Sequence, residues 1–397
     1  MKAHIILKKN EDKRIKNGHL WVFSNEILEF KEDIENGELV EVYDFQKNFI
    51  GEGFFNKNSL ITVRILSRVK IINLTNLIKE KLKSAYALRK QLYPSGNSFR
   101  LVFSESDFLP GLIVDKYNDT YVLQIYSAGF QKNIDIIINI LKHEFNAMNI
   151  FTKNESYFRK LEYLPEEDEV FLGIKKEEII NDGSIKYKIN FEKGHKTGFY
   201  FDQSDNRFFL EKLVKDKSVL DGFCNSGGFG LHSVKSGAKS VTFLDSSAFE
   251  MENVKYNYEL NKLNCQAYFI VNDVFEYLNK SIEENKKFDI VIIDPPAFAK
   301  SKKNLSKAKK GYEKLNRLAI QCVNDNGYLA SSSCSHHLKK KDFIQAVNSA
   351  AVKSGKILQL IYYNSASLDH PQVPSMEETT YLKFAVFKVS ENLQSQP

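Results

Sequence analysis

The pattern of hydrophobic and polar positions divides the chain into three stretches, and the first of them covers about seventy residues. Short apolar runs there, one with clear apolar and charged alternation, are separated by glycine and polar clusters, which is typical of β-strands joined by turns. The expected strands are residues 4–7, 20–23, 39–43, 49–55 and 60–66. The pattern predicts a small β-barrel domain over residues 1–70.

The second stretch, residues 71–183, is expected to form a small central α+β domain. Leucine, isoleucine and alanine recur at helical spacing from Leu74 to Leu88 with lysines between them, which predicts an amphipathic helix with a basic face. A strand pair around the Pro110-Gly111 turn, a strand over 121–126 and a helix near 131–145 follow. Residues 162–182 are acidic and have the composition of a loop, so we expect a domain boundary there.

The third stretch, residues 184–397, has a different pattern, because strand-like and helix-like segments alternate from about residue 217. This alternation predicts an α/β fold, a parallel sheet covered by helices on both faces. The expected strands are residues 218–220, 240–244, 267–271, 288–293, 328–332, 357–362 and 381–389. Ligands of such sheets bind beyond the carboxyl ends of the strands, so the residues at those ends carry most weight.

Length and composition exclude several classes of protein. The 397 residues suffice for two or three domains, and the apolar stretches are too short and too charged to span a membrane. The N-terminus lacks the apolar core of a secretory signal. The four cysteines, Cys224, Cys265, Cys322 and Cys334, lie far apart without metal-ligand spacing, which predicts no disulfide framework, no metal site and a cytoplasmic location.

Two segments are rich in positive charge, although the net charge of +6 is mild for this length. Residues 64–100 and 300–317 each contain a single acidic residue among many lysines and arginines. Such a segment is either a solvated helix face or a contact for nucleic acid, and composition alone does not decide between them.

A glycine-rich turn, Asp221-Gly-Phe-Cys-Asn-Ser-Gly-Gly-Phe-Gly230, follows the first strand of the expected sheet. Glycines at such a turn let the backbone approach a ligand closely. Their order differs from the G-x-G-x-x-G pattern of dinucleotide sites, and the carboxylate of Asp221 would repel a pyrophosphate. The turn therefore indicates a ligand with a cationic group, such as the amino group of a methionine-like moiety.

Three further acids follow the next three strands. Asp245 ends the second strand, where a carboxylate can accept hydrogen bonds from both ribose hydroxyls of an adenosine. Asp273, followed by Val274, suits an adenine amino group and ring face, and Asp294 begins a stiff loop, Asp294-Pro-Pro-Ala-Phe298. A single acid at such a position is more often a helix cap or turn residue. Four acids at four consecutive strand ends predict one site.

With these positions the chain resembles the class I S-adenosylmethionine-dependent methyltransferases. Two more motifs, Lys196-Thr-Gly-Phe-Tyr-Phe-Asp-Gln-Ser-Asp-Asn-Arg207 and Ser333-Cys-Ser-His-His337, make it similar over its whole length to the PUA-domain-containing enzymes that form 5-methylcytosine in large-subunit ribosomal RNA. The resemblance implies a PUA barrel, a central α+β domain and a Rossmann-like seven-stranded catalytic sheet. It implies S-adenosylmethionine as cofactor and, as partner, ribosomal RNA or an assembly intermediate. The cofactor-binding residues that we expect are Gln203, Arg207, Asp221, Phe223, Asn225, Gly227, Gly228, Phe229, Asp245, Ser246, Asp273 and Val274.

The chemistry of cytosine explains why such an enzyme needs a cysteine. C5 of cytosine is a poor nucleophile until a thiolate adds at C6. Cys334 directly follows the fifth strand, and in the strand order that the resemblance implies this strand neighbours the fourth. We therefore expect Cys334 as nucleophile and Asp294 as the residue that binds the base and assists protonation at N3. The residues expected to contact RNA are Pro295, Phe298, Lys300, Lys302, Lys303, Lys309 and Lys310.

Several alternatives stay open on the sequence. The base that removes the C5 proton could be His336, His337 or His370, and either of the first two could instead cap the next helix. The loop beginning at Asp294 also resembles the motif of enzymes that methylate exocyclic amino groups, and Ala297 stands where several RNA cytosine methyltransferases have a second cysteine. The rival functions are methylation of a guanine or adenine nitrogen, a nicotinamide-dependent oxidoreductase, and a noncatalytic RNA-binding or ribosome-assembly factor. A homodimer is also open.

Overall fold

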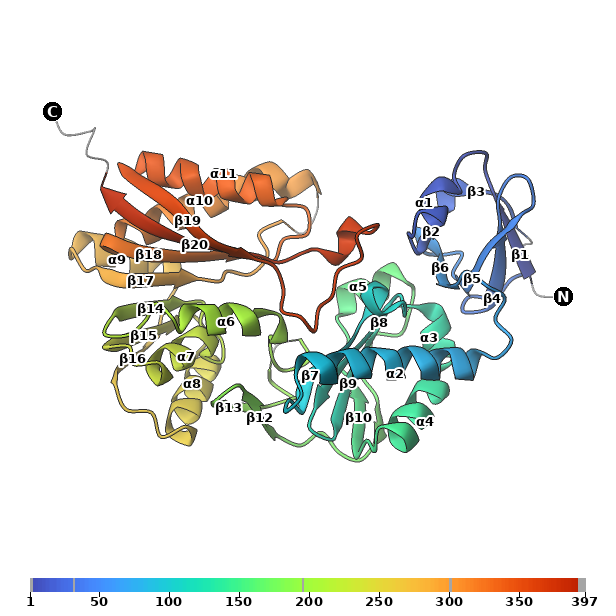
Figure 1. The fold of residues 1–397 in the computed structure, drawn as a ribbon, viewed down its shortest axis with the longest axis horizontal. Coiled ribbons are helices and arrows are strands. Elements are labelled where there is room, and N and C mark those ends of the chain that lie inside the picture. Colours follow the sequence, from blue (N-terminus) through green and yellow to red (C-terminus); the bar gives the residue numbers. More distant parts are fainter. Residues whose placement is uncertain (1–2, 31–32, 195, 300–301, 392–397) are drawn as a thin grey trace. The chain divides into compact units, whose positions relative to one another are not determined.

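The computed structural model describes residues 3–30, 33–194, 196–299 and 302–391, without the side chain of residue 302 (Figure 1). The chain divides into two compact units. Unit 1 comprises residues 1–180, 189–201 and 368–379, and unit 2 comprises residues 181–188, 202–367 and 380–397. Each unit therefore combines segments that are distant in the sequence. The expected three-domain division at residues 70 and 183 stays a prediction.

The N-terminal part of unit 1 is a six-stranded sheet with the strand order β2-β6-β5-β4-β1-β3. The strands are β1 (Ala3–Leu7), β2 (Trp21–Phe23), β3 (Ile27–Phe30), β4 (Leu39–Tyr43), β5 (Phe49–Phe55) and β6 (Ile61–Ser67), with the short helices α1 (Lys13–Lys16) and η1 (Ser24–Glu26). Alternate side chains such as Val40 and Val42 are buried in the core, as the pattern predicted. The pattern missed β3 because three of its four residues are exposed.

The rest of unit 1 contains a five-stranded sheet with the order β11-β10-β9-β8-β7. Its strands are β7 (Ser98–Phe103), β8 (Leu112–Tyr117), β9 (Thr120–Ile125), β10 (Asn149–Thr152) and β11 (Val170–Leu172), and its helices are α2 (Leu74–Leu92), η2 (Ser104–Asp107), α3 (Ala128–Lys132), α4 (Ile134–Glu144), α5 (Ser156–Leu161) and η5 (Glu377–Thr379). The predicted loop over residues 162–182 is wrong in part, because β11 and the whole of β12 (Glu178–Asp182) lie there. These short strands are held by pairing with β10 and with β13 (Ile185–Ile189), which local composition does not reveal.

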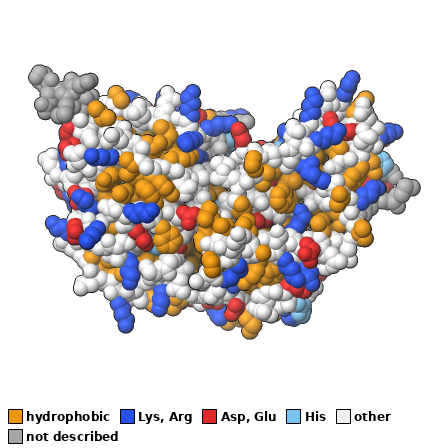
Figure 2. Space-filling view, in the orientation of Figure 1, with side chains coloured by type: hydrophobic (Ala, Val, Ile, Leu, Met, Phe, Trp, Pro, Cys, Tyr) orange, Lys and Arg blue, Asp and Glu red, His pale blue; other side chains and the backbone are white. Residues whose placement is uncertain are grey.

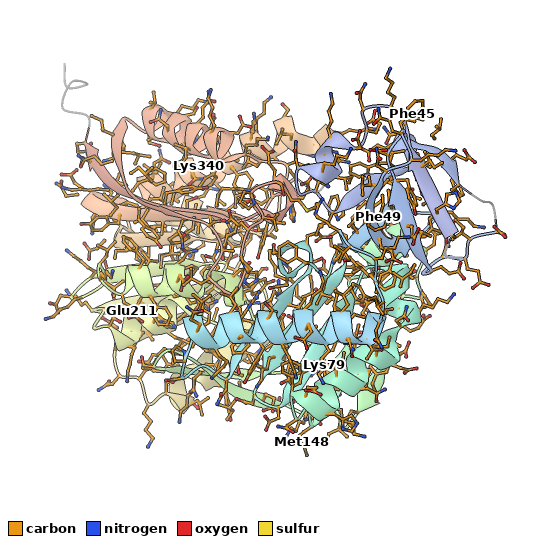
Figure 3. All side chains as sticks on the ribbon, turned by 45° about the vertical axis from the view of Figure 1, so that its right-hand side comes forward. Phe45, Phe49, Lys79, Met148, Glu211 and Lys340 are labelled. Atoms are coloured by element: carbon orange, nitrogen blue, oxygen red, sulfur yellow. The ribbon has the colours of Figure 1, made fainter. Side chains whose placement is uncertain are left out.

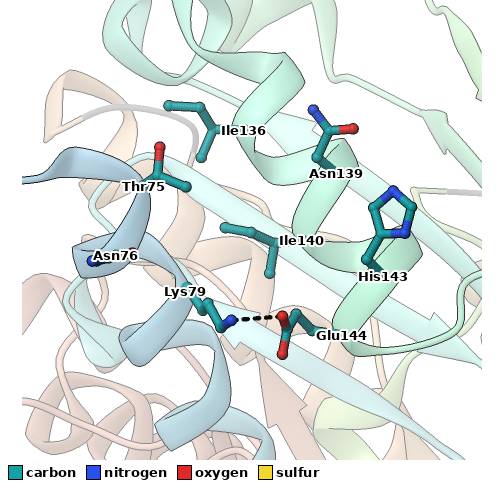
Figure 4. Close-up of a pocket in the computed structure, with 8 residues that line it drawn as sticks. All are labelled: Thr75, Asn76, Lys79, Ile136, Asn139, Ile140, His143 and Glu144. Atoms are coloured by element: carbon teal, nitrogen blue, oxygen red, sulfur yellow. Dashed lines mark hydrogen bonds and ion pairs between the residues drawn. The ribbon is translucent and has the colours of Figure 1, made fainter.

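A pocket of about 330 Å³ lies between α2 and α4 of unit 1 (Figure 4). Glu144 at its wall forms ion pairs of 2.6 Å with Lys79 and 2.7 Å with Lys83, so two lysines share this carboxylate. The residues that line it are Thr75, Asn76, Lys79, Ile136, Asn139, Ile140, His143 and Glu144. It contains none of the expected site residues.

Unit 2 is built on a seven-stranded sheet with the order β16-β15-β14-β17-β18-β20-β19. The strands are β14 (Ser218–Gly222), β15 (Ser240–Asp245), β16 (Gln266–Val271), β17 (Phe288–Ile293), β18 (Val323–Ser333), β19 (Lys356–Asn364) and β20 (Lys383–Glu391). The first five run parallel to one another, so their carboxyl ends meet at one edge of the sheet. That edge is where the four acids were expected.

The expectation of a wholly parallel sheet is wrong at β20. This strand pairs antiparallel with both β18 and β19. A parallel connection requires a crossover, usually through a helix, but in the described chain only the one-turn η5 lies between β19 and β20. The chain therefore returns in the opposite direction, and the first residue of β20 lies opposite the last residue of β18.

Helices cover both faces of this sheet. They are α6 (Ser204–Leu210), α7 (Gly228–Lys235), α8 (Ala248–Leu260), α9 (Val274–Glu283), α10 (Leu305–Gln321) and α11 (Lys340–Lys353), with the short helices η3 (Phe201–Gln203) and η4 (Lys302–Asn304). Figure 1 shows α10 and α11 over one face and α7 and α8 over the other. The predicted helix-covered α/β sheet is therefore confirmed in this part of the chain.

Among the described residues, no helix is long and apolar enough to cross a membrane. On the face shown in Figure 2, Lys and Arg side chains are dispersed among side chains of other kinds. The net charge of +6 is therefore not gathered into one patch on that face.

Candidate active site

The glycine loop (residues 221–230) connects β14 to α7 and holds a buried carboxylate. Asp221 is 1% exposed, and its Oδ2 accepts a hydrogen bond of 2.7 Å from the main-chain N–H of Gly230. Its Oδ1 has no hydrogen-bond partner among the described residues. Burial raises the pKa of Asp221 to about 7. A buried carboxylate oxygen of this kind fits the amino group of a ligand, because an ammonium would supply the missing hydrogen bond and charge.

The glycines of this loop are required by close packing. Gly227 has a φ of +83°, which favours glycine, and a Cβ at Gly230 would lie 2.2 Å from the ring of Phe243. A Cβ at Gly228 would lie 2.6 Å from Nε of Arg207. The loop therefore adopts a path that larger residues at these positions would obstruct.

Arg207 packs against the glycine loop at Gly228. It is 4% exposed, and its Nη1 forms an ion pair of 2.6 Å with Asp182, the last residue of β12. Asp182 also lies 3.4 Å from Nε2 of His232 on α7, whose Nδ1 is 2.6 Å from Glu211, labelled in Figure 3. The structure thus brings Arg207 against the backbone of the glycine loop, while direct contact with a cofactor stays a prediction.

The next two acids lie at the ends of adjacent parallel strands. Asp245 is half-buried at the end of β15 and accepts hydrogen bonds of 3.0 Å from the N–H groups of Asn225 and Ser247. Asp273 is exposed after β16 and caps α9 by accepting from the N–H of Glu276 at 3.1 Å. Asp273 is therefore a helix cap, as a lone acid often is, and it also stands at the predicted edge of the sheet.

The other residues expected near the cofactor surround the same edge. Asn225 and Phe223 have left-handed backbones, which places them in the turn after β14. Phe229 is buried and stacks on Phe384 with ring centroids 5.6 Å apart. Ser246 is exposed and Val274 is buried at the start of α9.

Asp294 at the end of β17 is held by two side chains. Ser332 Oγ donates to its Oδ1, and Gln203 Nε2 donates to its Oδ2 at 3.0 Å. Burial raises the pKa of Asp294 to about 6 despite these hydrogen bonds. Gln203, which we expected near the cofactor, therefore fixes the orientation of Asp294.

Cys334 follows β18, and β18 pairs with β17 as expected. Its Sγ lies 4.0 Å from the carbonyl oxygen of Pro295, the residue after Asp294. Cys334 is partly exposed, whereas Pro295 is buried. The structure thus brings the thiol and the 294–298 loop together from two neighbouring strand ends.

A hydroxyl cluster that the sequence did not reveal supports this pair of strand ends. Tyr312 of α10 is buried, its hydroxyl accepts from Ser333 Oγ at 2.9 Å, and it lies 3.0 Å from Ser335 Oγ. The ring of Phe298 packs on Tyr312 with centroids 4.7 Å apart. The signal for this cluster was the serine run before Cys334, but its partner lies on a distant helix.

The other three thiols lie in different surroundings. Cys322 is fully buried at the end of α10, and burial raises its pKa to about 12. Cys224 is buried within the glycine loop, where burial raises its pKa as well. Cys265 is partly buried before β16. Cys334 is the thiol whose Sγ lies against the 294–298 loop, 4.0 Å from the carbonyl oxygen of Pro295.

The structure shows the contacts of two candidate histidines and excludes one alternative role. The N-cap of α11 is Lys339, so the alternative that His336 or His337 caps this helix is wrong. His336 is exposed and stacks on Tyr381 with centroids 5.3 Å apart. His370 belongs to unit 1, where its Nδ1 lies 2.7 Å from Asp369.

The basic segment (residues 300–317) is described only in part. Lys300 lies outside the described residues, and so does the side chain of Lys302. Lys303 and Lys310 are exposed. Lys309 forms an ion pair of 2.8 Å with Asp342 of α11, so an RNA phosphate there would compete with a carboxylate.

Comparison with known proteins places this chain in a family. Residues 5–68 match a family described as PUA-like domain, and residues 198–348 match one described as Conserved hypothetical protein 95. A protein of Aliivibrio fischeri named ribosomal RNA large subunit methyltransferase I is 36% identical over 96% of this chain and 98% of its own length. Its namesake in Vibrio cholerae is 34% identical over 98% of this chain and 100% of its own length.

The chain belongs to the family of PUA-domain-containing, S-adenosylmethionine-dependent ribosomal RNA methyltransferases. Among solved structures, a methyltransferase complexed with SAH has a TM-score of 0.84 at 21% identity and covers 98% of this chain and 100% of its own. An S-adenosylmethionine-dependent methyltransferase from Streptococcus mutans has a TM-score of 0.83 at 20% identity, with the same coverage. At these identities the likeness concerns the fold. Membership of a methyltransferase family makes the oxidoreductase hypothesis and the noncatalytic hypothesis wrong.

Proposed function

We propose that this ribosomal RNA methyltransferase methylates C5 of a cytosine, through a covalent bond between Cys334 and C6 of the base. The observation that carries the proposal is the position of Sγ, 4.0 Å from the carbonyl oxygen of Pro295, the residue that follows the partly buried Asp294. A nucleophile and an acid at neighbouring strand ends are what addition to a cytosine ring requires.

The cofactor would be held by the glycine loop and the acids beside it. S-adenosylmethionine, when bound, supplies a methyl group made electrophilic by its sulfonium. Asp221 would accept hydrogen bonds from its amino group through the partnerless Oδ1. Asp245 would bind the ribose hydroxyls, and Asp273 with Val274 would contact the adenine. Gly227, Gly228 and Phe229 would line the approach, and Arg207 would keep the loop in place through its packing against Gly228.

Cys334 would act on the base as a nucleophile and Asp294 as a proton donor. The thiolate of Cys334 adds to C6 and forms the S–C6 bond, while Asp294 in its protonated form donates to N3 and stabilises the electron density displaced from the ring. C5 then becomes nucleophilic enough to be methylated. Afterwards a base removes the C5 proton, and the electron pair of that bond restores the C5=C6 double bond as the thiolate leaves. Since Ala297 replaces a second cysteine, release would use another base, for which His336 and His337, in the same unit as Cys334, remain candidates.

The RNA would be held outside the catalytic unit as well. The match of residues 5–68 to a PUA-like domain and the name of the relatives support large-subunit ribosomal RNA as the substrate, free or in an assembly intermediate. Exposed Lys303 and Lys310 would contact phosphates, since they follow the 294–298 loop directly. A target base inside a structured RNA would be flipped out to reach Cys334. A cytoplasmic location belongs to the same proposal.

Methylation of a nitrogen is the rival, because the Asp294-Pro-Pro-Ala-Phe298 sequence also suits an exocyclic amine. Bisulfite sequencing of ribosomal RNA from cells with and without the gene distinguishes the two. Our proposal predicts one cytosine that resists conversion only when the gene is present. An unchanged bisulfite profile together with the loss of a methylated guanine or adenine would favour the rival.

A further inference from the structure

A buried lysine lies at the strand end that carries Cys334. Lys383 is the first residue of β20, and its Cα is paired with that of Ser333 at the end of β18. Its side chain is inside the protein, since Lys383 is only 3% exposed. Its Nζ donates to the carbonyl oxygens of Ser335 and Tyr381, both at 2.6 Å. The ammonium is thus anchored to the residue that follows Cys334.

Burial of the Lys383 ammonium is favourable only if an anionic group lies near it. The two carbonyl groups satisfy N–H donors of the ammonium, but they carry no net charge, and a buried charge that is not balanced is costly. Burial lowers the pKa of Lys383 to about 8, whereas the interaction with Cys334 raises it. The same interaction acts on the thiol in the opposite sense, because a nearby cation favours the thiolate.

We propose that Lys383 is a positioning residue for Cys334. Lys383 stabilises the thiolate of Cys334 and holds the main chain at Ser335. The inference rests on the proposed function in one respect, namely that Cys334 is the nucleophile. The ionisation of the thiol, however, is a property of the protein alone. It can be measured without RNA and without cofactor.

Among the described residues, the other ionisable groups known to contact this strand end do not supply a buried positive charge. Tyr312 from α10 contacts Ser333 and Ser335, and burial raises its pKa, so the phenol is neutral near pH 7. Tyr381 donates to Asp202 at 2.5 Å, and His336 stacks on the ring of Tyr381. Asp294, which follows β17, would oppose a thiolate when ionised. Lys383 supplies the positive charge that favours the thiolate.

The test is the rate at which iodoacetamide alkylates Cys334 as a function of pH, read from the Cys334 peptide of the full-length protein by mass spectrometry. We expect an apparent pKa about one unit below the value of about 8.5 for a free cysteine. Lys383→Met should raise this pKa by about one unit and slow alkylation at pH 7.5 about fivefold. Lys388→Met, on the same strand, should leave the pKa of Cys334 unchanged. The alkylation rate of Cys265 in the same digest shows whether each variant is folded.

Two outcomes overturn the inference: an apparent pKa of 8.5 or more in the wild-type protein, or the same low value in Lys383→Met. If Lys383→Met does not fold, the wild-type profile alone decides. In methylation assays, Lys383→Met should lower kcat more than it changes KM and should move the acidic limb of the pH profile to higher pH.

The alkylation result separates this inference from the proposed function. A low pKa in a protein that forms no covalent adduct with RNA supports the Lys383–Cys334 interaction and contradicts the proposed chemistry. An adduct formed by a protein in which Cys334 has an ordinary pKa supports the chemistry and contradicts the role of Lys383.

Discussion

Gln203 donates a hydrogen bond of 3.0 Å from its Nε2 to Oδ2 of Asp294. Gln203 ends the short helix η3 that precedes α6, and Asp294 follows β17, so the bond joins two segments that are ninety-one positions apart. Ser332 binds the other carboxyl oxygen. Asp294 is thereby fixed in one orientation at the strand end next to Cys334, which is what an acid that acts on a base requires.

Replacement of Asp294 should abolish most of the activity without unfolding the site. Asp294→Asn keeps the shape and can accept from Ser332, but it cannot transfer a proton. We expect kcat to fall at least about 100-fold while the affinity for S-adenosylhomocysteine stays within about threefold. The pKa of about 6 also predicts that the contribution of protonated Asp294 declines above pH 6, a decline that Asp294→Asn should remove.

Steady-state methylation of ribosomal RNA between pH 5 and pH 9 checks this, with the exposed Asp325→Asn as the matched control. Retention of kcat within about threefold in Asp294→Asn would contradict the role given to this carboxyl.

Cofactor affinity should depend on pH through Asp221. Its pKa of about 7 means that the carboxyl is increasingly protonated below pH 7, and a protonated carboxyl does not attract an ammonium. The dissociation constant of S-adenosylhomocysteine should therefore rise, up to about tenfold per pH unit, as pH falls below 7. Asp221→Asn should bind weakly, without this pH dependence. Calorimetry from pH 5.5 to pH 8.5 measures both.

The same carboxyl has an effect on stability with a defined sign. A raised pKa means that ionisation is less favourable in the folded protein, so this group makes folding less stable as pH rises from about 4 to 7. Asp221→Asn should accordingly have an equal or higher melting temperature than wild type at pH 8 without cofactor. A large loss of stability there would show that the ionised carboxylate is structurally required.

Gly230 should be intolerant of a side chain. Its Cβ would lie 2.2 Å from the ring of Phe243, so Gly230→Ala should lower the free energy of unfolding by about 3 kcal/mol. Gly355→Ala is the control, because Gly355 has a φ of +64° and no atom lies within 4 Å of its Cβ position. There the cost should be about 1 kcal/mol, from the backbone alone. Urea denaturation compares the two, and equal losses would contradict the close packing.

Exposed lysines of the basic segment should contribute to RNA binding through electrostatics. Each phosphate contact adds about 0.7 to 0.9 to the slope of log affinity against log salt. Lys303→Gln with Lys310→Gln should reduce this slope by about 1.5 in filter binding to ribosomal RNA. Lys280→Gln, whose side chain is 68% exposed on α9, should leave the slope unchanged. An unaltered slope in the double variant would mean that these lysines contact only solvent.

The sequence predicted the catalytic sheet well, because its signals are local. β14, β15 and β17 are largely buried apolar runs, and β16 is an apolar run at the edge of the sheet. Asp221, Asp245, Asp273 and Asp294 lie at or just after the ends of β14 to β17 as expected. The direction of β20 was not predicted, because it depends on the missing helix between β19 and β20. The short β11 and β12 were missed since cross-strand pairing, which is not local, holds them.

The candidate site was predicted only in part, because some of its residues meet through contacts that are not local in the sequence. Asp294 and Cys334 follow strands directly, so sequence position placed them together. Tyr312 and Lys383 reach this strand end from α10 and from β20, and their positions depend on packing and register. Gln203 was expected to bind the cofactor, and its hydrogen bond to Asp294 could not be derived from a motif.

The central claim is that Cys334 forms a covalent bond with cytosine C6, and RNA that contains 5-fluorocytosine tests it most directly. Fluorine at C5 prevents the removal of a proton, so the adduct should persist after methyl transfer. With S-adenosylmethionine, the wild-type protein should form a complex that survives denaturing electrophoresis and whose linked peptide contains Cys334. Cys265→Ala should form it equally, and Cys334→Ala should not. A wild-type protein that methylates ordinary ribosomal RNA yet forms no such complex would contradict the account.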